Sequence, residues 1–278
     1  MSSLKSPRKE RRQVKKWACH KLECLGEYLE TYAAVLKKAS CYFLELFAGG
    51  SIDCNSNECP IDSPELGALK TKSRFTGYLL LTRDQPSQRK LKKLAAPYNG
   101  SISIITGNPI NDRVIKKLYD IVPRSAASLA LIDPPGYRKL RWTTIKKLAA
   151  HGLDWQGHKT ELLIIFPLEM ALARNLTRPQ CEASITRFYG NSQWLEIRQK
   201  RRDNKIGPDE ARRKLVELYK TSLKKLGYRY VSSLTPARFS NPPFYHIIWA
   251  SDRGSQKKTL KKAFTRERYL PCELFHSE

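Results

Sequence analysis

The stretch Tyr42-Phe43-Leu44-Glu45-Leu46-Phe47-Ala48-Gly49-Gly50 decides the fold. Residues with strand preference lead into an acid, Glu45, and then into a turn of small residues. Because glycine has no Cβ and tolerates positive φ, such a turn lets the backbone approach a ligand closely. After the first strand of an α/β sheet it would lie at the carboxyl edge, where open sheets bind ligands. The alternative is a buried strand that merely ends in a glycine turn.

Outward from this stretch, hydrophobic periodicity predicts alternating strands and helices. Strands are expected at 41–47, 75–81, 101–106, 128–132 and 162–166, and helices at 17–38, 85–94, 113–122, 143–150, 211–226 and 257–264. A helix and turn is expected at 185–194, Ser63-Pro64-Glu65 indicates a helix start, and Gly227 is expected to end the helix 211–226. This alternation predicts a Rossmann-like α/β fold: a mostly parallel central sheet with helices on both faces. Segments 228–233 and 244–251 are expected to close the sheet as an antiparallel strand pair.

The domain organisation is expected to be simple. We expect one α/β domain over 17–270 with a charged insertion at about 198–214. A basic flexible tail would cover 1–16, and a second tail would cover 271–278.

The charge of the chain favours a polyanionic partner. Lys+Arg outnumber Asp+Glu by 51 to 26, giving a formal net charge of +25, and nucleic acid, DNA or RNA, is the natural partner for such an excess. A membrane surface competes, but no apolar run approaches the roughly 18 residues of a spanning helix. The N-terminus also lacks the apolar core of a signal peptide, and we expect a cytoplasmic protein.

The seven cysteines predict neither a disulfide framework nor a metal site. Their number is odd, and no secretion signal precedes them. The pairs Cys19/Cys24 and Cys54/Cys59 have a spacing that zinc could use, but no histidines at ligand spacing complete either pair.

A second motif, Asp133-Pro134-Pro135, ends an apolar strand. The prolines fix the backbone and leave the Pro134 carbonyl without a helical partner. A carboxylate beside a pre-set carbonyl accepts both N–H donors of an exocyclic amine, as on adenine or cytosine. Methyl transfer to such an amine depends mainly on orientation. The alternative is a strand-terminating proline turn without function.

The order of these motifs resembles the class I S-adenosylmethionine-dependent methyltransferases, in particular those that methylate amino groups. Over nearly the whole chain the sequence also resembles the three-Cys-motif partner family (TcmP). That resemblance is carried by 44–49, 63–69, 133–136 with Trp142-Thr143, 162–167 with Arg174, 188–190 with Trp194, and 244–251. It implies a methyltransferase-like fold with S-adenosylmethionine as cofactor, and association with a three-cysteine-motif, radical-type partner protein.

The resemblance also implies the cofactor site. Glu45, Phe47, Ala48, Gly49 and Gly50 would form its methionine end. The family usually ends its second strand with an acid that holds the ribose hydroxyls. In this sequence that position is Thr82, with Asp84 two residues late, and the position of the adenine contact is Asn108.

The segment after the proline motif mixes aromatic and basic residues, as single-stranded nucleic-acid sites do. The aromatic expected after Asp-Pro-Pro is replaced by Gly136, so Tyr137 is the candidate stacking face. The candidate nucleic-acid-binding residues are Arg138, Lys139, Arg141, Trp142, Arg201 and Arg202. Trp142 could equally be core.

His246 is expected to be a buried, hydrogen-bonded histidine, whereas Glu169 and Arg174 are candidates for supporting the site.

Two hypotheses follow. The first is a methyltransferase acting on an exocyclic amine of a nucleic-acid base, with Asp133, Pro134, Pro135 and Tyr137 at the catalytic centre. The second is a non-catalytic nucleic-acid-binding module on a methyltransferase fold that serves a partner protein. The features that discriminate between them are Thr82 and Gly136. Asp84 in the ribose position would favour the first hypothesis, and a ribose pocket filled by side chains would favour the second. Neither predicts an oligomeric state.

Overall fold

A computed structural model describes residues 7–49, 62–168, 172–234 and 246–265, with side chains from residue 20 onward. Gly50, Cys54, Cys59, Glu169, residues 1–6 and the C-terminal tail lie outside the described residues.

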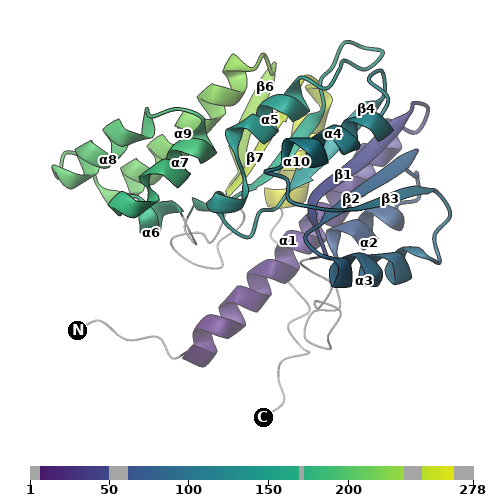
Figure 1. Cartoon of the computed structure of the whole chain (residues 1–278), viewed down its shortest axis with the longest axis horizontal. Coiled ribbons are helices and arrows are strands. Elements are labelled where there is room, and N and C mark those ends of the chain that lie inside the picture. The colour runs from purple at the N-terminus through teal and green to yellow at the C-terminus, as the bar shows by residue number, and fades with distance from the viewer. Residues whose placement is uncertain (1–6, 50–61, 169–171, 235–245, 266–278) are drawn as a thin grey trace.

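The strands and helices alternate along the chain, as predicted (Figure 1). The strands are β1 Cys41–Ala48, β2 Gly77–Thr82, β3 Ser101–Thr106, β4 Ala127–Ile132, β5 Glu161–Phe166, β6 Tyr230–Leu234 and β7 His246–Ser251. The α-helices are α1 Pro7–Val35, α2 Pro64–Leu69, α3 Gln85–Ala95, α4 Asp112–Ile121, α5 Trp142–Ala149, α6 Ala173–Asn175, α7 Glu182–Tyr189, α8 Trp194–Arg202, α9 Pro208–Lys225 and α10 Ser255–Thr265. Short 3-10 helices in the described residues include η2 Tyr137–Lys139 and η4 Pro179–Cys181.

The seven strands form one sheet in the order β3-β2-β1-β4-β5-β7-β6. Strands β1 to β5 pair in parallel, and β7 pairs antiparallel with both β5 and β6. The predicted Rossmann-like α/β fold, mostly parallel with an antiparallel pair at one edge, is therefore confirmed. The chain turns from β1 toward β2 on one side and reaches β4 on the other, so the strand order reverses between β1 and β4.

Helices cover both faces of the sheet because its strands carry apolar side chains on both. One core packs α4, α5, α7 and α9 against alternate strand residues such as Leu44, Leu79 and Ile164. The other core packs α1, α2, α3 and α10 against the residues between them, such as Phe43, Tyr78 and Leu163. The β1–β4 carboxyl edge is thus held between two helical layers.

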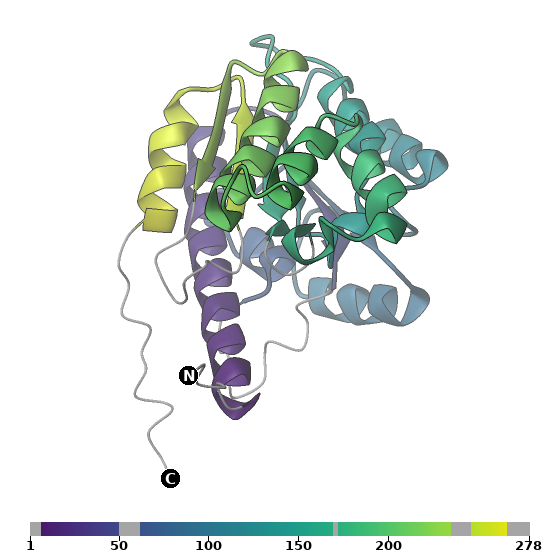
Figure 2. The same ribbon diagram turned by 90° about the vertical axis from the view of Figure 1, so that its left-hand side faces the viewer.

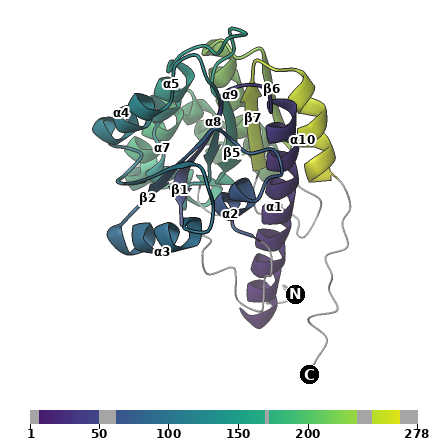
Figure 3. The same ribbon diagram turned by 90° about the vertical axis from the view of Figure 1, so that its right-hand side faces the viewer.

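The N-terminal helix is longer than the sequence predicts. It begins at Pro7, so residues 7–16, expected as part of a flexible tail, are helical. Its C-terminal half packs on the sheet through Leu25, Leu29 and Tyr32, and it contacts α10 (Figures 2 and 3). Its N-terminal half extends away from the sheet (Figure 1).

The remaining differences lie at element ends. The second strand begins at Gly77 rather than at 75. The predicted charged insertion is the end of α8, a short connection and the first turns of α9. The segment expected as one helix and turn over 185–194 divides into α7 and α8, since Gly190 adopts φ +72° and ends α7. Gly227, with φ +87°, follows α9 as predicted.

Candidate functional site

The glycine turn and the Asp-Pro-Pro motif lie at the same edge of the sheet. Strand β1 pairs in parallel with β4, with Glu45 beside Leu131 in register, and Asp133 follows the end of β4 directly. Gly49 closes β1 with φ +88°, a conformation that glycine adopts at little cost. Ala48 lies opposite Thr82 at the end of β2. Backbone topology alone therefore places these predicted residues along one edge.

Among the described residues, three carboxylates and one ammonium group gather at this edge. Glu45 and Glu65 are buried, with 4% and 0% exposure, and Asp133 is partly exposed. Lys21, reaching from α1, donates to Asp133 Oδ2 across 2.5 Å. The Gly49 N–H donates to Glu65 Oε1 at 3.0 Å, so the carboxylate of α2 fixes the glycine turn.

Burial shapes the electrostatics of this cluster. It raises the pKa of Glu45 well above its usual value, and the neighbouring Glu65 and Asp133 carboxylates raise it further, whereas Lys21 lowers it. Burial also raises the pKa of Glu65. The Oε2 atoms of both glutamates are buried and accept no hydrogen bond from the described residues. Carboxylates in this condition are stabilised by a cation that brings its own N–H donors.

The sequence did not point to Lys21 or Glu65. Glu65 stood only as part of a predicted helix start, Ser63-Pro64-Glu65, and Lys21 stood in an amphipathic helix. Neither has a local signal, because both reach the site only through the packing of α1 and α2 on the sheet. Glu65 could have been noticed as an acid in a segment of otherwise apolar and small residues.

The positions predicted to hold a cofactor nucleoside are only partly equipped. Thr82 is buried at 1% exposure, and its Oγ1 has no hydrogen-bond partner among the described residues. Asp84 instead caps α3 by accepting from the Ser87 N–H at 2.9 Å, and it pairs with Arg83 at 2.8 Å. These hydrogen bonds, that from the Ser87 backbone foremost, lower the pKa of Asp84 to about 2. Asn108 is exposed, and its Oδ1 accepts from the Ile110 N–H.

Changing Thr82 to valine tests whether the orphan hydroxyl is kept for a ligand. Valine has nearly the same shape, and a buried hydroxyl without a partner costs about 1–3 kcal/mol. We expect Thr82→Val to raise the free energy of unfolding by about 1 kcal/mol in urea titrations, while weakening any nucleoside ligand. Thr106→Val, at the end of the neighbouring β3, is the matched control for stability, since its Oγ1 is also unpaired. A loss of stability at Thr82 would show that the hydroxyl has a structural role.

Tyr137, the candidate stacking face, and Trp142, a candidate nucleic-acid contact, both belong to the core. Tyr137 is 1% exposed and packs edge-on against Phe188 with ring centroids 6.2 Å apart. Trp142 is 8% exposed and meets Tyr219 edge-on at 5.1 Å. The prediction that Tyr137 offers a free face to a base is wrong for this structure, because Phe188 of α7 packs against it. For Trp142 the structure matches the core alternative.

The three residues of the proline motif differ in their exposure to solvent. Pro134 is buried, whereas Pro135 is exposed and Asp133 keeps 22% of its side chain accessible. The carboxylate can therefore be reached from solvent, although Lys21 now occupies it.

The predicted basic residues remain at the surface. Arg138, Lys139, Arg141 and Arg202 are exposed and Arg201 is half-buried. The Arg138 guanidinium also donates to Cys181 Sγ at 3.0 Å.

His246 is partly buried, and burial lowers its pKa to about 4, with Arg212 adding to the effect. The His246 imidazole is therefore neutral at physiological pH. Arg174 is exposed on α6.

Comparison with known proteins does not extend this picture: no family model and no curated protein matches the chain. Membership of the three-Cys-motif partner family accordingly stays a prediction.

No helix in the described part of the chain combines the length and apolarity needed to cross a bilayer. Within the same residues, no cluster of His, Cys, Asp and Glu side chains is suited to hold a metal ion.

Proposed function

We propose that the protein is an S-adenosylmethionine-dependent methyltransferase that acts on an exocyclic amino group of a nucleic-acid base. The observation that carries the proposal is the buried pair Glu45 and Glu65 beside the Gly49 turn. Each keeps one oxygen without a donor, and the cofactor carries both an ammonium and a sulfonium group. The strand order, with an antiparallel seventh strand between the fifth and sixth, is the order expected for a class I methyltransferase and supports the proposal.

The residues present fit the methionine half of the cofactor better than its nucleoside half. Glu45 and Glu65 would accept from the ammonium group, and Ala48 and Gly49 would let the ligand approach the backbone. Thr82 offers a single hydroxyl to the ribose where a carboxylate would make a charge-assisted contact. Asn108 would accept from the adenine amine through its Oδ1, which already accepts a hydrogen bond from the Ile110 N–H. When bound, the cofactor would supply an activated methyl group.

The remaining task of the chain is to orient the target amine. Lys21 shows that Asp133 Oδ2 binds a nitrogen donor at this edge. A substrate amine would displace Lys21, donate one N–H to Asp133 and the other to the Pro134 carbonyl, and so present its lone pair. The net charge of +25 would hold the phosphates of the same strand, and a duplex substrate would need the base flipped out.

A specific observation also favours the non-catalytic alternative. The Lys21–Asp133 ion pair fills the proposed amine position from within, and Asp84 is committed to capping α3. A chain that had lost catalysis and kept the fold for binding nucleic acid beside a partner protein would show these same features. A three-cysteine-motif partner and a cytoplasmic location remain parts of the proposal for either function.

Methyl transfer from tritiated cofactor to single-stranded and duplex DNA and RNA separates the two functions. We expect transfer by the native protein and a loss of at least about 100-fold in Asp133→Asn, because the target amine would be misoriented. Asp62→Asn, which removes an exposed carboxylate paired with Lys70, is the matched control and should retain activity. Binding of nucleic acid without transfer to any substrate would favour the second function.

A further inference from the structure

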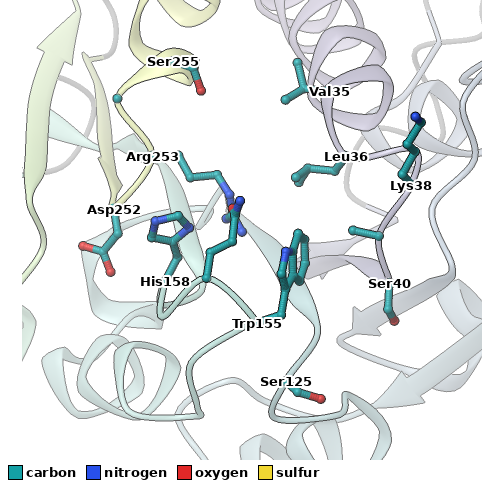
Figure 4. A pocket seen from close by; sticks show the side chains of 13 residues that line it. Val35, Leu36, Lys38, Ser40, Ser125, Trp155, His158, Asp252, Arg253 and Ser255 are labelled. Carbon is teal, nitrogen blue, oxygen red and sulfur yellow. The ribbon is translucent and has the colours of Figure 1, made fainter.

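A separate cavity opens at the opposite edge of the sheet. It has a volume of about 750 Å³. Its walls include Ser40 just before β1, Ser125 just before β4 and His158 just before β5, so it lies at the amino edge of the parallel strands. The end of α1 and the segment from Asp252 to Ser255 complete it (Figure 4).

One wall of the cavity is aromatic and apolar. Trp155 is 52% exposed although it is a large hydrophobic side chain, and Val35 is 55% exposed. In Figure 4 Trp155, Leu36 and Arg253 point toward the same space. The Arg253 guanidinium lies 5.7 Å from the centroid of the Trp155 ring system, which helps to hold the indole in place. An exposed indole of this kind offers a face on which a flat ring can stack.

The charges around the cavity favour an anion. The Arg253 side chain is 5% exposed and pairs with Asp154, yet its Nε has no acceptor among the described residues. Helix α10 begins at Ser255, beside Arg253, and its first-turn N–H groups and dipole add positive charge. Lys38 adds a further exposed cation at the rim.

The nearby carboxylates are already satisfied. Asp154 Oδ1 accepts from the N–H groups of Gln156 and His158. Asp252, the acidic residue in the described lining, accepts from the Lys159 N–H, the Lys159 ammonium and the Arg229 N–H. Asp252 is balanced by Lys159, and Asp154 is balanced by Arg253 itself. Arg253 therefore offers an incoming anion a hydrogen-bond donor, its Nε, and the net positive charge comes from Lys38 and the start of α10.

We propose that this cavity binds a nucleotide, with the base stacked on Trp155, the phosphate beside Arg253 and the start of α10, and Lys38 adding positive charge at the rim. A flat ring joined to an anion matches the two walls, and the cavity is large enough for one such unit. The same chemistry is offered by a free mononucleotide and by the phosphorylated end of a nucleic-acid strand. This site is independent of the carboxyl-edge site and does not require methyl transfer.

Calorimetric titration of adenosine 5′-monophosphate at low salt tests the proposal. Base stacking on an aromatic side chain is worth about 1–3 kcal/mol, so Trp155→Ala should weaken binding by at least about 5-fold. Leu153→Ala, on the same loop and equally exposed at 54%, lies outside the described lining and should bind as the native protein does. Lys38→Glu should weaken binding of the monophosphate but not that of adenosine.

Further titrations identify the source of the ligand and the place where it binds. Inorganic phosphate alone should bind more weakly than the monophosphate, because it cannot use Trp155. A 5′-phosphorylated hexanucleotide that binds more tightly than the monophosphate, and loses affinity with Trp155→Ala, identifies a strand end; the reverse order identifies a free nucleotide. Gly49→Trp should leave the affinity unchanged. Absence of binding, or binding lost with Gly49→Trp and unaffected by Trp155→Ala, would overturn the proposal.

Discussion

Replacing Lys21 by methionine should lower the free energy of unfolding by about 3 kcal/mol at pH 7.5. The Lys21 side chain is 9% exposed, and its ammonium group is the cation described among Glu45, Glu65 and Asp133. Removing one member of a buried ion pair leaves the other charge uncompensated, at a typical cost of about 3–5 kcal/mol. The low end of that range applies here, because Asp133 keeps 22% of its side chain accessible. Urea unfolding of the native protein and the variant measures this loss.

The loss should depend on pH with a defined sign. The folded-state pKa of Glu45 is already raised, and losing Lys21 raises it further. A carboxyl whose pKa is higher in the folded state destabilises the fold when ionised, so the penalty appears as pH rises and fades as pH falls. The deficit of Lys21→Met should therefore be smaller at pH 5.5 than at pH 7.5. Lys37→Met, an exposed lysine just beyond the same helix, should cost little at either pH; an equal deficit in both variants would contradict the assigned role of Lys21.

A second large effect is expected from Glu161, which lies in β5 with 0% exposure. Burial raises its pKa to about 7, partly offset by hydrogen bonds with Ser251, Tyr28 and Trp249. The Tyr28 hydroxyl donates to Glu161 Oε1 and accepts from Trp249 Nε1 at 3.1 Å. Burial therefore favours the protonated carboxyl, whereas the hydrogen bonds favour the carboxylate, and the balance leaves the pKa at about 7.

Stability should fall as pH rises across the range between the unfolded and folded pKa values of Glu161. The unfolded chain releases the proton near the ordinary value of 4.5 and the folded chain near 7, so the folded state holds more protons in between. At 1.36 kcal/mol for each pKa unit, the loss amounts to about 3 kcal/mol from pH 4.5 to pH 7.

Glu161→Gln keeps an acceptor for Tyr28 and has no proton to lose, so it should remove this contribution. Comparing urea midpoints of the variant and the native protein at pH 5 and pH 8 isolates it from the other titrating groups. Glu196→Gln, an exposed acid on α8, should leave the pH dependence unchanged. If Glu161→Gln preserved the native dependence, the carboxyl would have to be ionised throughout.

The fold could be predicted because its signals are local. The apolar runs 128–132 and 162–166 are strands in the structure, and the small-residue turn at Gly49 required only glycine's backbone freedom. The order of motifs then placed Asp133 and Glu45 at one edge, since parallel strands end together.

What could not be predicted depends on contacts between distant segments. Lys21 and Asp133 are 112 residues apart, and the amino-edge cavity is built from the end of α1, the loop before β5 and the start of α10. Tyr137 was misjudged, and Trp142 could not be assigned, because their exposure is decided by α7 and α9, which follow them in the chain. Periodicity along one segment carries no information about what later segments cover.

Calorimetric titration of S-adenosylhomocysteine into the pure protein tests the central claim most directly. We predict micromolar binding that is abolished by Gly49→Trp and retained in Trp155→Ala, which places the ligand at the carboxyl edge rather than in the amino-edge cavity. Thermal melts would confirm that both variants are folded. No heat from the native protein at millimolar ligand, or binding that survives Gly49→Trp, would contradict the account.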